Sequence, residues 1–429
     1  MRLLNFQVNY YKCISDSGII NINDIACFIG NNNSGKTALF EALYKLNPAF
    51  SKNKFFESDD FPKDKIEYQN SKTRVITCTF KLTDAELIFI NKKFGDHCIN
   101  SDIITVSRDY ANNLHWDFEI NEESYVKHLI DKRNLTKLFE KHLSKINSVE
   151  SCYSVAKELP PLSTSLVSFI TQLELLKIRS MKEEIIEGYF QHWIPKFLYI
   201  SEVHKLPGYF SLKQITKALS SSDDVKEAAK TALAFLKLLE VDINSLLTEP
   251  DNNKLLETMN NLSSNLSSHL SSILQIFEHL QIDIDIQSLV AQNVRIDSTI
   301  YINITNKETK ITLPIGKHGK SLVYFLSFLC SLSIIKDKTE PYIILIDTPS
   351  DHLSIDAQSE FCKYIHDVLT QKHQILYTTH SPFMINTKAK DNLYSVFIKP
   401  NFGTVVSQDV NSDSLTKKIS DIADKFYSK

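Results

Sequence analysis

Glycine is scarce in this chain, and so are net charge, paired cysteines and long apolar runs. Only nine of the 429 residues are glycine, so each glycine is more informative than usual. The formal net charge of −3 gives no bulk reason to expect nucleic-acid binding, although a local basic face would not show in this total. No apolar run approaches the ~20 residues that span a bilayer, and the N-terminus lacks the apolar run of a signal peptide. We therefore expect a cytoplasmic protein that does not enter a membrane.

The seven cysteines form no C-x-x-C pair, and their number is odd. Most of them lie in apolar runs, which indicates buried, reduced thiols in a reducing compartment. They are Cys13, Cys27, Cys78, Cys98, Cys152, Cys330 and Cys362.

The length suits two or three structural units. Alternating or wholly apolar runs predict strands near residues 4–8, 25–29, 74–80 and 103–106. The pattern from 122 to 195 is helical, with loops near Pro160-Pro161. We predict an N-terminal half of a nucleotide-binding head over 1–121, a helical insertion over 122–290 and the C-terminal half of the head over 291–429.

Residues 221–281 carry the clearest helical pattern. Ser221–Asp224 is typical of a helix start, and Val225–Leu239 is rich in alanine, leucine and lysine. Apolar residues then recur at three- and four-residue spacing from Leu255 to Phe277, which predicts a long amphipathic helix. We expect the two helices to form a hairpin. The serine-rich piece Ser263–Ser272 keeps the stripe and is therefore not interpreted as a linker.

The final third alternates strand and helix. Tyr342–Ile346 reads as a buried strand, Ala357–Thr370 as a helix and Gln374–Thr379 as the next strand. Apolar strands joined by a helix indicate a parallel sheet. The predicted fold class is therefore α/β.

One segment fits the phosphate-binding pattern G-x-x-x-x-G-K-[ST] at every position. Its residues are Gly30, Asn31, Asn32, Asn33, Ser34, Gly35, Lys36 and Thr37. An apolar strand precedes the loop and a helical run follows it, as a P-loop requires. Backbone N–H groups and the helix N-terminus would surround the phosphates, with Lys36 at the β- and γ-phosphates. We predict that this loop binds ATP with Mg²⁺.

A P-loop needs an acidic partner for the metal ion at the end of a neighbouring strand. Asp347 directly follows the strand Tyr342–Ile346, so we predict that Asp347 and the Thr37 hydroxyl hold the ion. In hydrolytic P-loop proteins of this layout the next residue is usually a glutamate that orients water, but here it is Thr348. A threonine hydroxyl cannot accept a proton at neutral pH as a carboxylate does. Either another carboxylate serves, with Asp351 nearest in sequence, or turnover is slow.

His380 ends the strand after Asp347, in the stretch Thr378-Thr379-His380-Ser381-Pro382. A histidine at the carboxyl edge of a parallel sheet faces the ligand crevice and could contact the γ-phosphate. The alternative is a capping or core histidine.

Together these segments resemble the ATPase domain of the OLD family, within the ABC-type, SMC- and RecF-like ATPases. The resemblance rests on Asn9–Lys12, Gly30–Thr37, Leu345–Asp347 and Thr378–Phe383, and extends to the helical insertion near 195–199 and 223–280. It implies a P-loop head with a helical insertion that pairs with a second head around ATP, giving a homodimer or higher homo-oligomer.

The chain departs from that family at Thr348, at the signature element and in length. The element that reaches a partner's γ-phosphate corresponds to Lys317–Ser321, where Gly319, Lys320 and Ser321 could still supply N–H groups, a charge and a hydroxyl. The alternative is a solvated basic turn. About fifty residues follow His380, so we expect no TOPRIM nuclease domain.

Such ATPases without a nuclease resemble subunits of bacterial anti-phage systems, including PARIS-type and Septu-type pairs. The resemblance implies an ATP-driven sensor or scaffold that controls a separate nuclease or toxin subunit. The alternatives are a nucleotide-binding scaffold with little hydrolysis and an SMC- or RecF-like DNA repair ATPase. Direct DNA binding stays possible, although no long coiled coil or basic stripe is apparent in the sequence.

Overall fold

The computed structural model describes residues 1–50, 53–159, 163–201, 206–220, 227–291, 294–333, 335, 340–387 and 389–427. The chain divides into two compact units made of interleaved segments. Unit 1 contains Met1–Asn23, Glu41–Phe197 and Ile398–Val405, and unit 2 contains Asp24–Phe40, Leu198–Phe397 and Val406–Lys429. The division into the three consecutive segments 1–121, 122–290 and 291–429 stays a prediction.

Antiparallel strands form the sheet of unit 1, in the order β7, β6, β5, β1, β2 and the start of β16. The burial of β1 and β5 alternates only in part, since a register shift between Leu3 and Asn5 interrupts the alternation in β1 and two consecutive residues, Val75 and Ile76, are buried in β5. The strands are β1 (Arg2–Tyr11), β2 (Ile14–Asp16), β3 (Ile20–Asn21), β5 (Arg74–Lys81), β6 (Ile103–Asp109), β7 (Leu114–Asp117) and β16 (Gly403–Ser407).

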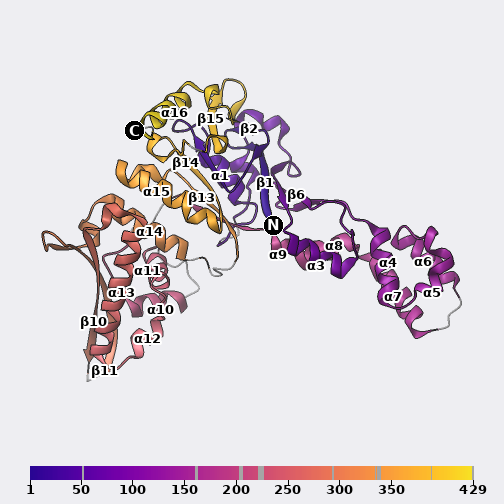
Figure 1. Cartoon of the computed structure of the whole chain (residues 1–429), viewed down its shortest axis with the longest axis horizontal. Helices are drawn as coiled ribbons and strands as arrows, with labels where there is room; N and C mark the ends of the chain where they lie inside the picture. The colour runs from indigo at the N-terminus through magenta and orange to yellow at the C-terminus, as the bar shows by residue number, and fades with distance from the viewer. Residues whose placement is uncertain are drawn as a thin grey trace. The chain divides into compact units, whose positions relative to one another are not determined.

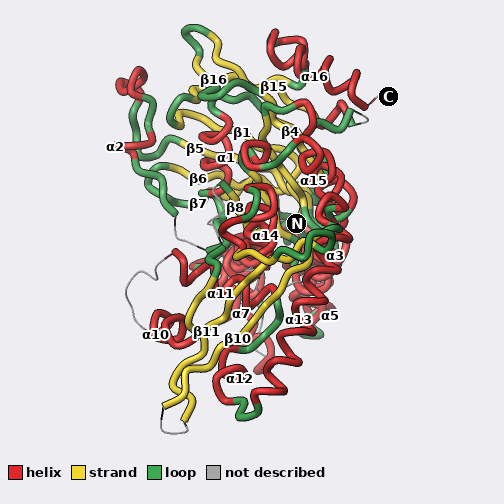
Figure 2. The backbone as a smooth tube through the Cα atoms, turned by 90° about the vertical axis from the view of Figure 1, so that its left-hand side faces the viewer, coloured by secondary structure: helices red, strands yellow, loops and turns green. Residues whose placement is uncertain are grey.

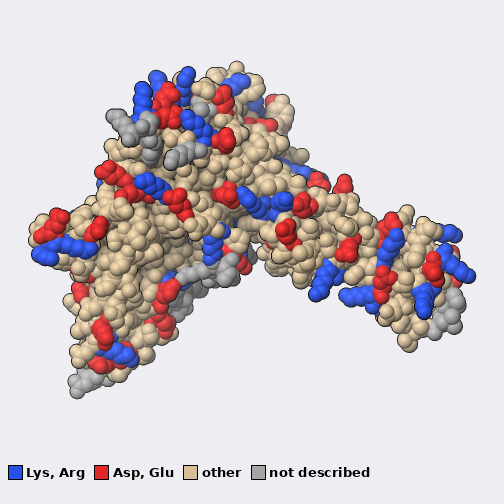
Figure 3. Space-filling view, viewed as in Figure 1, with Lys and Arg blue, Asp and Glu red and all other residues tan. Residues whose placement is uncertain are grey.

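The helices of unit 1 confirm the helical pattern predicted for 122–195, and Figure 1 shows α4 to α7 gathered in one group. In the view of Figure 3, basic and acidic side chains are interspersed over this group. The loop expected at Pro160-Pro161 lies outside the described residues. The helices are α2 (Glu57–Asp60), α3 (Asp84–Phe94), α4 (Glu122–Lys132), α5 (Thr136–Phe139), α6 (Val149–Glu158), α7 (Thr164–Ile178), α8 (Met181–Ile185) and α9 (Gln191–Trp193).

Unit 2 contains the predicted parallel sheet, in the order β15, β4, β14 and β13, and β8 adjoins β13. Every residue of β4, β13 and β14 is buried, which explains why these strands are apolar throughout. Because β4, β13 and β14 are parallel, Gly30, Asp347 and His380 all follow strand ends at one edge of the sheet. The strands are β4 (Ile25–Ile29), β8 (Lys196–Ile200), β13 (Tyr342–Ile346), β14 (Gln374–Thr379) and β15 (Leu393–Lys399).

The crossover helices of unit 2 follow the predicted pattern. The helix expected over 357–370 is α15, which begins before residue 357 and ends before residue 370. Unit 2 contains the helices α14 (Lys320–Ser333), α15 (Ile355–Asp367) and α16 (Ser414–Tyr427). The helix α1 (Lys36–Tyr44) begins in unit 2 and ends in unit 1. No described helix is long and apolar enough to cross a membrane.

A second, antiparallel sheet belongs to unit 2 and lies within and beyond the stretch expected to be helical. Figure 2 shows β10 and β11 running side by side as a long hairpin, and β9 and β12 pair with β11. The elements of this region are β9 (Tyr209–Ser211), β10 (Leu280–Ala291), β11 (Val294–Asn306), β12 (Thr312–Pro314), α10 (Leu212–Ser220), α11 (Glu227–Leu238), α12 (Ile243–Thr248) and α13 (Asn252–Ile273).

The predicted long amphipathic helix is confirmed as α13, but the predicted helical hairpin is wrong. α13 packs along β10, and α11 packs against α14. Serine hydroxyls explain the docking of α13, because Ser263 Oγ and Ser267 Oγ accept hydrogen bonds from the backbone N–H groups of Ile284 and Ile282, each at 2.8 Å. The helix start expected at Ser221–Asp224 lies outside the described residues.

The cysteines are free thiols, and burial is confirmed for all of them except one. Cys13 is exposed, contrary to the expectation of buried thiols. It lies between β1 and β2, where its short loop reaches the surface.

Candidate functional site

The P-loop has the predicted strand–loop–helix context, since β4 ends at Ile29 and α1 begins at Lys36. Its first glycine is required by close approach, because a Cβ on Gly30 would lie 2.1 Å from the carbonyl oxygen of Val396 in β15. Asn33 and Gly35 have φ values of 66° and 102°, which asparagine and glycine tolerate better than other residues. The loop backbone therefore folds in a shape that bulkier side chains would prevent.

Lys36 is held inside this loop, with 5% of its surface exposed. Its Nζ donates hydrogen bonds to the carbonyl oxygens of Gly30 at 2.9 Å and Asn31 at 2.7 Å. Burial lowers the pKa of Lys36, while the charges of Asp347 and Asp351 act in the opposite direction. An anionic phosphate beside this ammonium group would stabilise its charged form, so the lysine fits a phosphate ligand.

Asp347 directly follows β13 and is 5% exposed. Its Oδ2 accepts a hydrogen bond from Thr37 Oγ1 at 2.8 Å. The two residues are thus brought together although 310 positions separate them in the chain. A carboxylate and a hydroxyl oxygen form a hard donor set, which fits Mg²⁺.

Two further hydroxyl groups reach Asp347, and sequence reasoning did not assign either of them a role. Tyr199 in β8 donates a hydrogen bond to Oδ2 at 3.0 Å, and Thr378 in β14 donates to Oδ1. Thr378 lies two residues before His380, in the stretch that the sequence analysis placed at the end of a strand. Its position in β14, beside β13, could therefore have indicated a contact with Asp347. Tyr199 lies in the strand β8, so the assignment of residues 195–199 to the helical insertion was wrong, and that assignment gave Tyr199 no role.

Thr348 occupies the position where a glutamate was expected, and its backbone is unusual. Its φ and ψ are 46° and 51°, in the left-handed region that β-branched residues rarely adopt. The backbone N–H of Thr348 donates a hydrogen bond to Thr378 Oγ1 at 2.8 Å, which helps to hold this conformation. The hydroxyl of Thr378 therefore connects Thr348 and Asp347.

The structure brings together Asp351 and His380, which are the other two predicted catalytic residues. Nε2 of His380 lies 3.3 Å from Oδ1 of Asp351, and both side chains are partly exposed. The charge of Asp351 also acts on Lys36, where it opposes the lowering of the pKa by burial. Nδ1 of His380 is buried and has no hydrogen-bond partner in the part of the chain that the structure describes.

A buried glutamine joins the segments that carry Asp351 and His380. Gln358 in α15 donates hydrogen bonds from Nε2 to the carbonyl oxygens of Ser350 at 3.0 Å and Leu353 at 2.8 Å. Its Oε1 accepts a hydrogen bond from Ser381 Oγ. Displacement of α15 would therefore act on both segments.

The signature-like element immediately precedes and begins α14. Gly319 is exposed, with open space where a Cβ would lie, and Lys320 is the first residue of the helix. Ser321 Oγ accepts a hydrogen bond from Ser354 N at 2.9 Å and lies 3.4 Å from the carbonyl oxygen of His352, to which it donates. The structure thus places Ser321 against the segment that follows Asp351.

Comparisons with known proteins found a matching family and similar solved structures. A family model described as an AAA ATPase domain matches residues 1–385. A solved SMC head bound to the C-winged helix domain of ScpA is similar with a TM-score of 0.43 and 12% identity, over 95% of this chain and 97% of that chain. The SMC head domain from Thermotoga maritima gives a TM-score of 0.37 and 11% identity, with 95% and 98% covered. No curated protein matches the chain. The predicted α/β P-loop fold is confirmed.

Proposed function

Because the chain belongs to the AAA ATPase domain family, we propose that it is an ATP-dependent switch that controls a separate effector protein. Membership of this family implies nucleotide binding. The observation that carries the proposal is the 2.8 Å contact between Thr37 Oγ1 and Asp347 Oδ2, which joins the P-loop to the end of β13. Lys36 follows the same loop, and its Nζ donates to the carbonyl oxygen of Gly30 at 2.9 Å.

The proposed ligand is ATP with Mg²⁺. Backbone N–H groups of Gly30–Thr37 and the Lys36 ammonium would bind the phosphates, since the helix N-terminus and the lysine both favour negative charge. Thr37 and Asp347 would hold the ion, whose role when bound is to neutralise charge on the phosphates. Tyr199 and Thr378 orient the Asp347 carboxylate through their hydroxyl groups.

Hydrolysis in this proposal is slow and depends on Asp351. A water oxygen bonds to the terminal phosphorus, the bridging bond to ADP breaks, and Asp351 accepts the proton that water releases. His380 orients Asp351 through the 3.3 Å contact. Thr348 contributes no carboxylate, so the rate should lie below that of a site with a glutamate at this position.

The switch itself would work by pairing of two heads. Gly319, Lys320 and Ser321 are the proposed contacts to nucleotide bound by a second copy, because they are accessible at the start of α14. The proposed effector is a separate nuclease or toxin, in the manner of the OLD-like ATPases of bacterial anti-phage defence, and the proposed location is the cytoplasm.

The test measures ATP binding and phosphate release by the full chain. Lys36→Ala should abolish binding of a fluorescent ATP analogue, and Lys418→Ala, which removes an exposed lysine from α16, should leave it intact. Equal binding by wild type and Lys36→Ala would refute the proposal. Measurement of the molecular mass in solution, with and without ATP, then tests the pairing of heads. Pairing predicts a larger species in the presence of ATP only.

A second candidate, a nucleotide-binding scaffold with almost no hydrolysis, is favoured by Thr348, which stands where a glutamate was expected, and by the altered element Lys317–Ser321. Under this alternative, wild type binds ATP but releases almost no phosphate, and Thr348→Glu raises the release. Brisk turnover by wild type, abolished by Lys36→Ala, would exclude the scaffold.

A further inference from the structure

Unit 1 contains a groove of about 460 Å³ between the strand β7 and the helical segment from α8 to α9. This volume falls within the range of roughly 300–1,000 Å³ typical of ligand pockets. β7 contributes Leu114 and Trp116 to one wall, and the helical segment contributes Glu183, Ile186 and Glu187 to the other. None of the residues proposed to bind nucleotide lines the groove, so it is a separate feature of the protein.

The strand β7 has an open edge at this groove. β7 is the last strand of its sheet, and no described strand pairs with its outer side (Figure 2). The backbone N–H of Asp109 donates to the carbonyl oxygen of Asn113 at 3.2 Å, so these residues form a hydrogen-bonded pair that continues the β6–β7 ladder. Because hydrogen-bonded and non-hydrogen-bonded pairs alternate in an antiparallel ladder, Leu114 and Trp116 stand in non-hydrogen-bonded pairs. Their backbone N–H and C=O groups therefore point away from β6, toward the outer side of β7.

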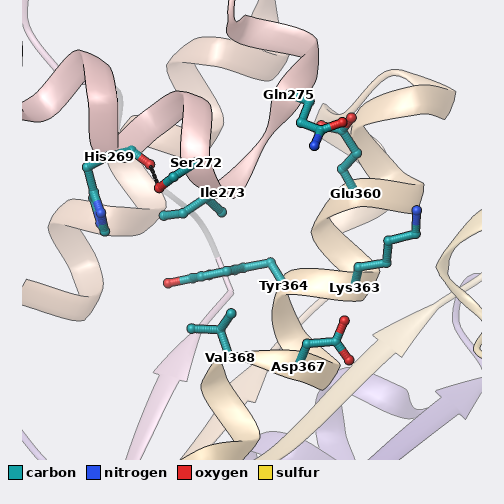
Figure 4. Close-up of a pocket in the computed structure, with 9 residues that line it drawn as sticks. All are labelled: His269, Ser272, Ile273, Gln275, Glu360, Lys363, Tyr364, Asp367 and Val368. Atoms are coloured by element: carbon teal, nitrogen blue, oxygen red, sulfur yellow. Dashed lines mark hydrogen bonds between the residues drawn. The ribbon is translucent and has the colours of Figure 1, made fainter.

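This open edge distinguishes the groove from a cavity of similar size in unit 2. The cavity shown in Figure 4 has a volume of about 410 Å³ and is lined by residues of α13 and α15 and by the residues that follow these helices. A helix bonds its own backbone groups, whereas a strand edge leaves them for another strand. The groove of unit 1 therefore offers main-chain donors and acceptors in addition to side chains.

The side chains that β7 presents to the groove are apolar. Leu114 is 37% exposed, and Trp116, two residues further on the same face of the strand, is partly exposed. The Trp116 ring packs against Phe190, with the ring centroids 6.0 Å apart. Phe190 ends a π-helical turn that begins at Ile186, a rare conformation that is frequent at functional sites. The strand edge is thus joined to an apolar floor.

The helical wall gives the groove a negative charge. Glu183 and Glu187 are exposed, and no described lysine or arginine lines the groove. Arg179, outside the groove, pairs with Glu187, but both side chains are exposed, so this ion pair is weak and can exchange for another. Glu183 accepts a hydrogen bond from the backbone N–H of Ser180 at 3.0 Å, which positions its carboxylate. A basic side chain is therefore the complement of this wall.

We propose that this groove binds an extended segment of a partner protein, which adds to β7 as a further strand. Its backbone would bond to the N–H and C=O groups of Leu114 and Trp116, at the usual strand spacing of about 4.8 Å. Side chains on the groove side recur at every second position, so an apolar residue would contact Ile186 and a basic residue two positions away would meet Glu183. The partner segment thus carries apolar and basic residues in turn at every second position.

The experiment measures the binding of fluorescent ten-residue peptides to the full chain. In the probe peptide, valine and lysine take turns at every second position and threonine fills the others. Two derivatives carry N-methyl groups, one on the valines and lysines and one on the threonines, so each lacks one alternate set of N–H donors.

Only one set of N–H groups faces β7 in an added strand. The two methylated peptides should therefore differ in affinity by at least about tenfold, since several hydrogen bonds are lost in one of them only. Equal binding of the two derivatives, or no saturable binding of the unmethylated peptide, would overturn the proposal.

Leu114→Pro tests the strand edge itself. Proline has no N–H and is tolerated where the N–H of an edge strand faces outward, so this variant removes an outward donor but no bond to β6. Binding of the probe peptide should weaken about tenfold. A cooperative thermal transition checks that the variant is folded, and unchanged peptide binding by the folded variant would contradict strand addition.

Two charge variants test the helical wall without disturbing the edge. Glu183→Gln keeps the cap of α8, since glutamine also serves in a capping box, and should weaken binding of the probe peptide about threefold. Asp117→Asn removes a carboxylate from the opposite face of β7 and should bind the peptide as wild type does. Equal losses for the two variants would assign binding to the general charge of the surface and overturn the proposal.

A second copy of this chain is the alternative occupant of the groove. It predicts a dimer in solution without nucleotide that Leu114→Pro disrupts, and this result in the absence of peptide binding would overturn the proposal. Lys36→Ala should bind the probe peptide as wild type does, because the groove lies in unit 1 and Lys36 in unit 2. Failure of peptide binding therefore leaves the proposed ATP binding intact, and failure of ATP binding leaves strand addition intact.

Discussion

Nε2 of His380 and Oδ1 of Asp351 lie 3.3 Å apart, at the edge of the parallel sheet where β13 and β14 end. Neither side chain is fully buried, so both are accessible to a nucleotide and to water. The pair places a carboxylate near the P-loop although the residue after Asp347 is Thr348.

The first prediction concerns this pair. Asp351→Asn should reduce phosphate release by about 10- to 100-fold, within the range expected for loss of general-base catalysis. ATP affinity should change little, because the phosphates are held by the P-loop. Asp356→Asn, which removes an exposed carboxylate from α15, is the control and should keep wild-type turnover. Unchanged turnover in Asp351→Asn would remove Asp351 from the proposed mechanism.

The backbone of Thr348 leads to the second prediction. A β-branched residue at φ 46° is strained, whereas asparagine adopts this region more readily. Thr348→Asn should therefore stabilise the protein by about 1 kcal/mol and raise its thermal midpoint. Thr348→Val retains the β-branch and should give no gain. Equal midpoints for the asparagine and valine variants would show that no strain is relieved.

The close approach at Gly30 gives the third prediction. In Gly30→Ala the new methyl group would lie 2.1 Å from the carbonyl oxygen of Val396, so the P-loop must shift. We expect loss of ATP binding and a clear fall in the thermal midpoint. Gly316→Ala is the matched control, since a Cβ there meets no atom within 4 Å. Normal ATP binding by Gly30→Ala would contradict the described loop geometry.

The fourth prediction concerns stability in acid. Burial, followed by the charge of Lys372, lowers the pKa of His373 from 6.5 to about 4, and its Nδ1 accepts a hydrogen bond from the N–H of Tyr342 at 3.1 Å. Since the unfolded chain then binds the proton more readily, stability is complete above about pH 6.5 and falls as the pH drops toward 4. The loss is at most about 1.4 kcal/mol per pH unit.

His373→Asn tests this dependence because an amide oxygen can still accept the Tyr342 N–H but does not titrate near neutral pH. The fall in thermal midpoint between pH 7.5 and pH 5 should be smaller in this variant than in wild type. His279→Asn, which replaces an exposed histidine, should keep the wild-type fall. An unchanged fall in His373→Asn would assign the acid sensitivity elsewhere, with His366 the next candidate.

Local pattern was enough to find the P-loop and the strand ends of the site. Gly30–Thr37 is a contiguous motif, and a short apolar run followed by Asp347 or His380 identifies a buried strand and its end. The stripe of α13 likewise predicted which face is buried. It did not predict what covers that face, which is why the expected hairpin was wrong and β10 lies there instead.

By itself, the sequence determined a strand–loop–helix P-loop, apolar parallel strands and the absence of a carboxylate at residue 348, because each depends on neighbouring residues. Only the tertiary structure decided that Tyr199, from 148 residues away, bonds to Asp347, and that Asp351 faces His380. It also decided that the backbone of Thr348 is left-handed and that β10 covers the buried face of α13. These relationships depend on strand order and helix packing between distant segments, and no local spacing of residues encodes either.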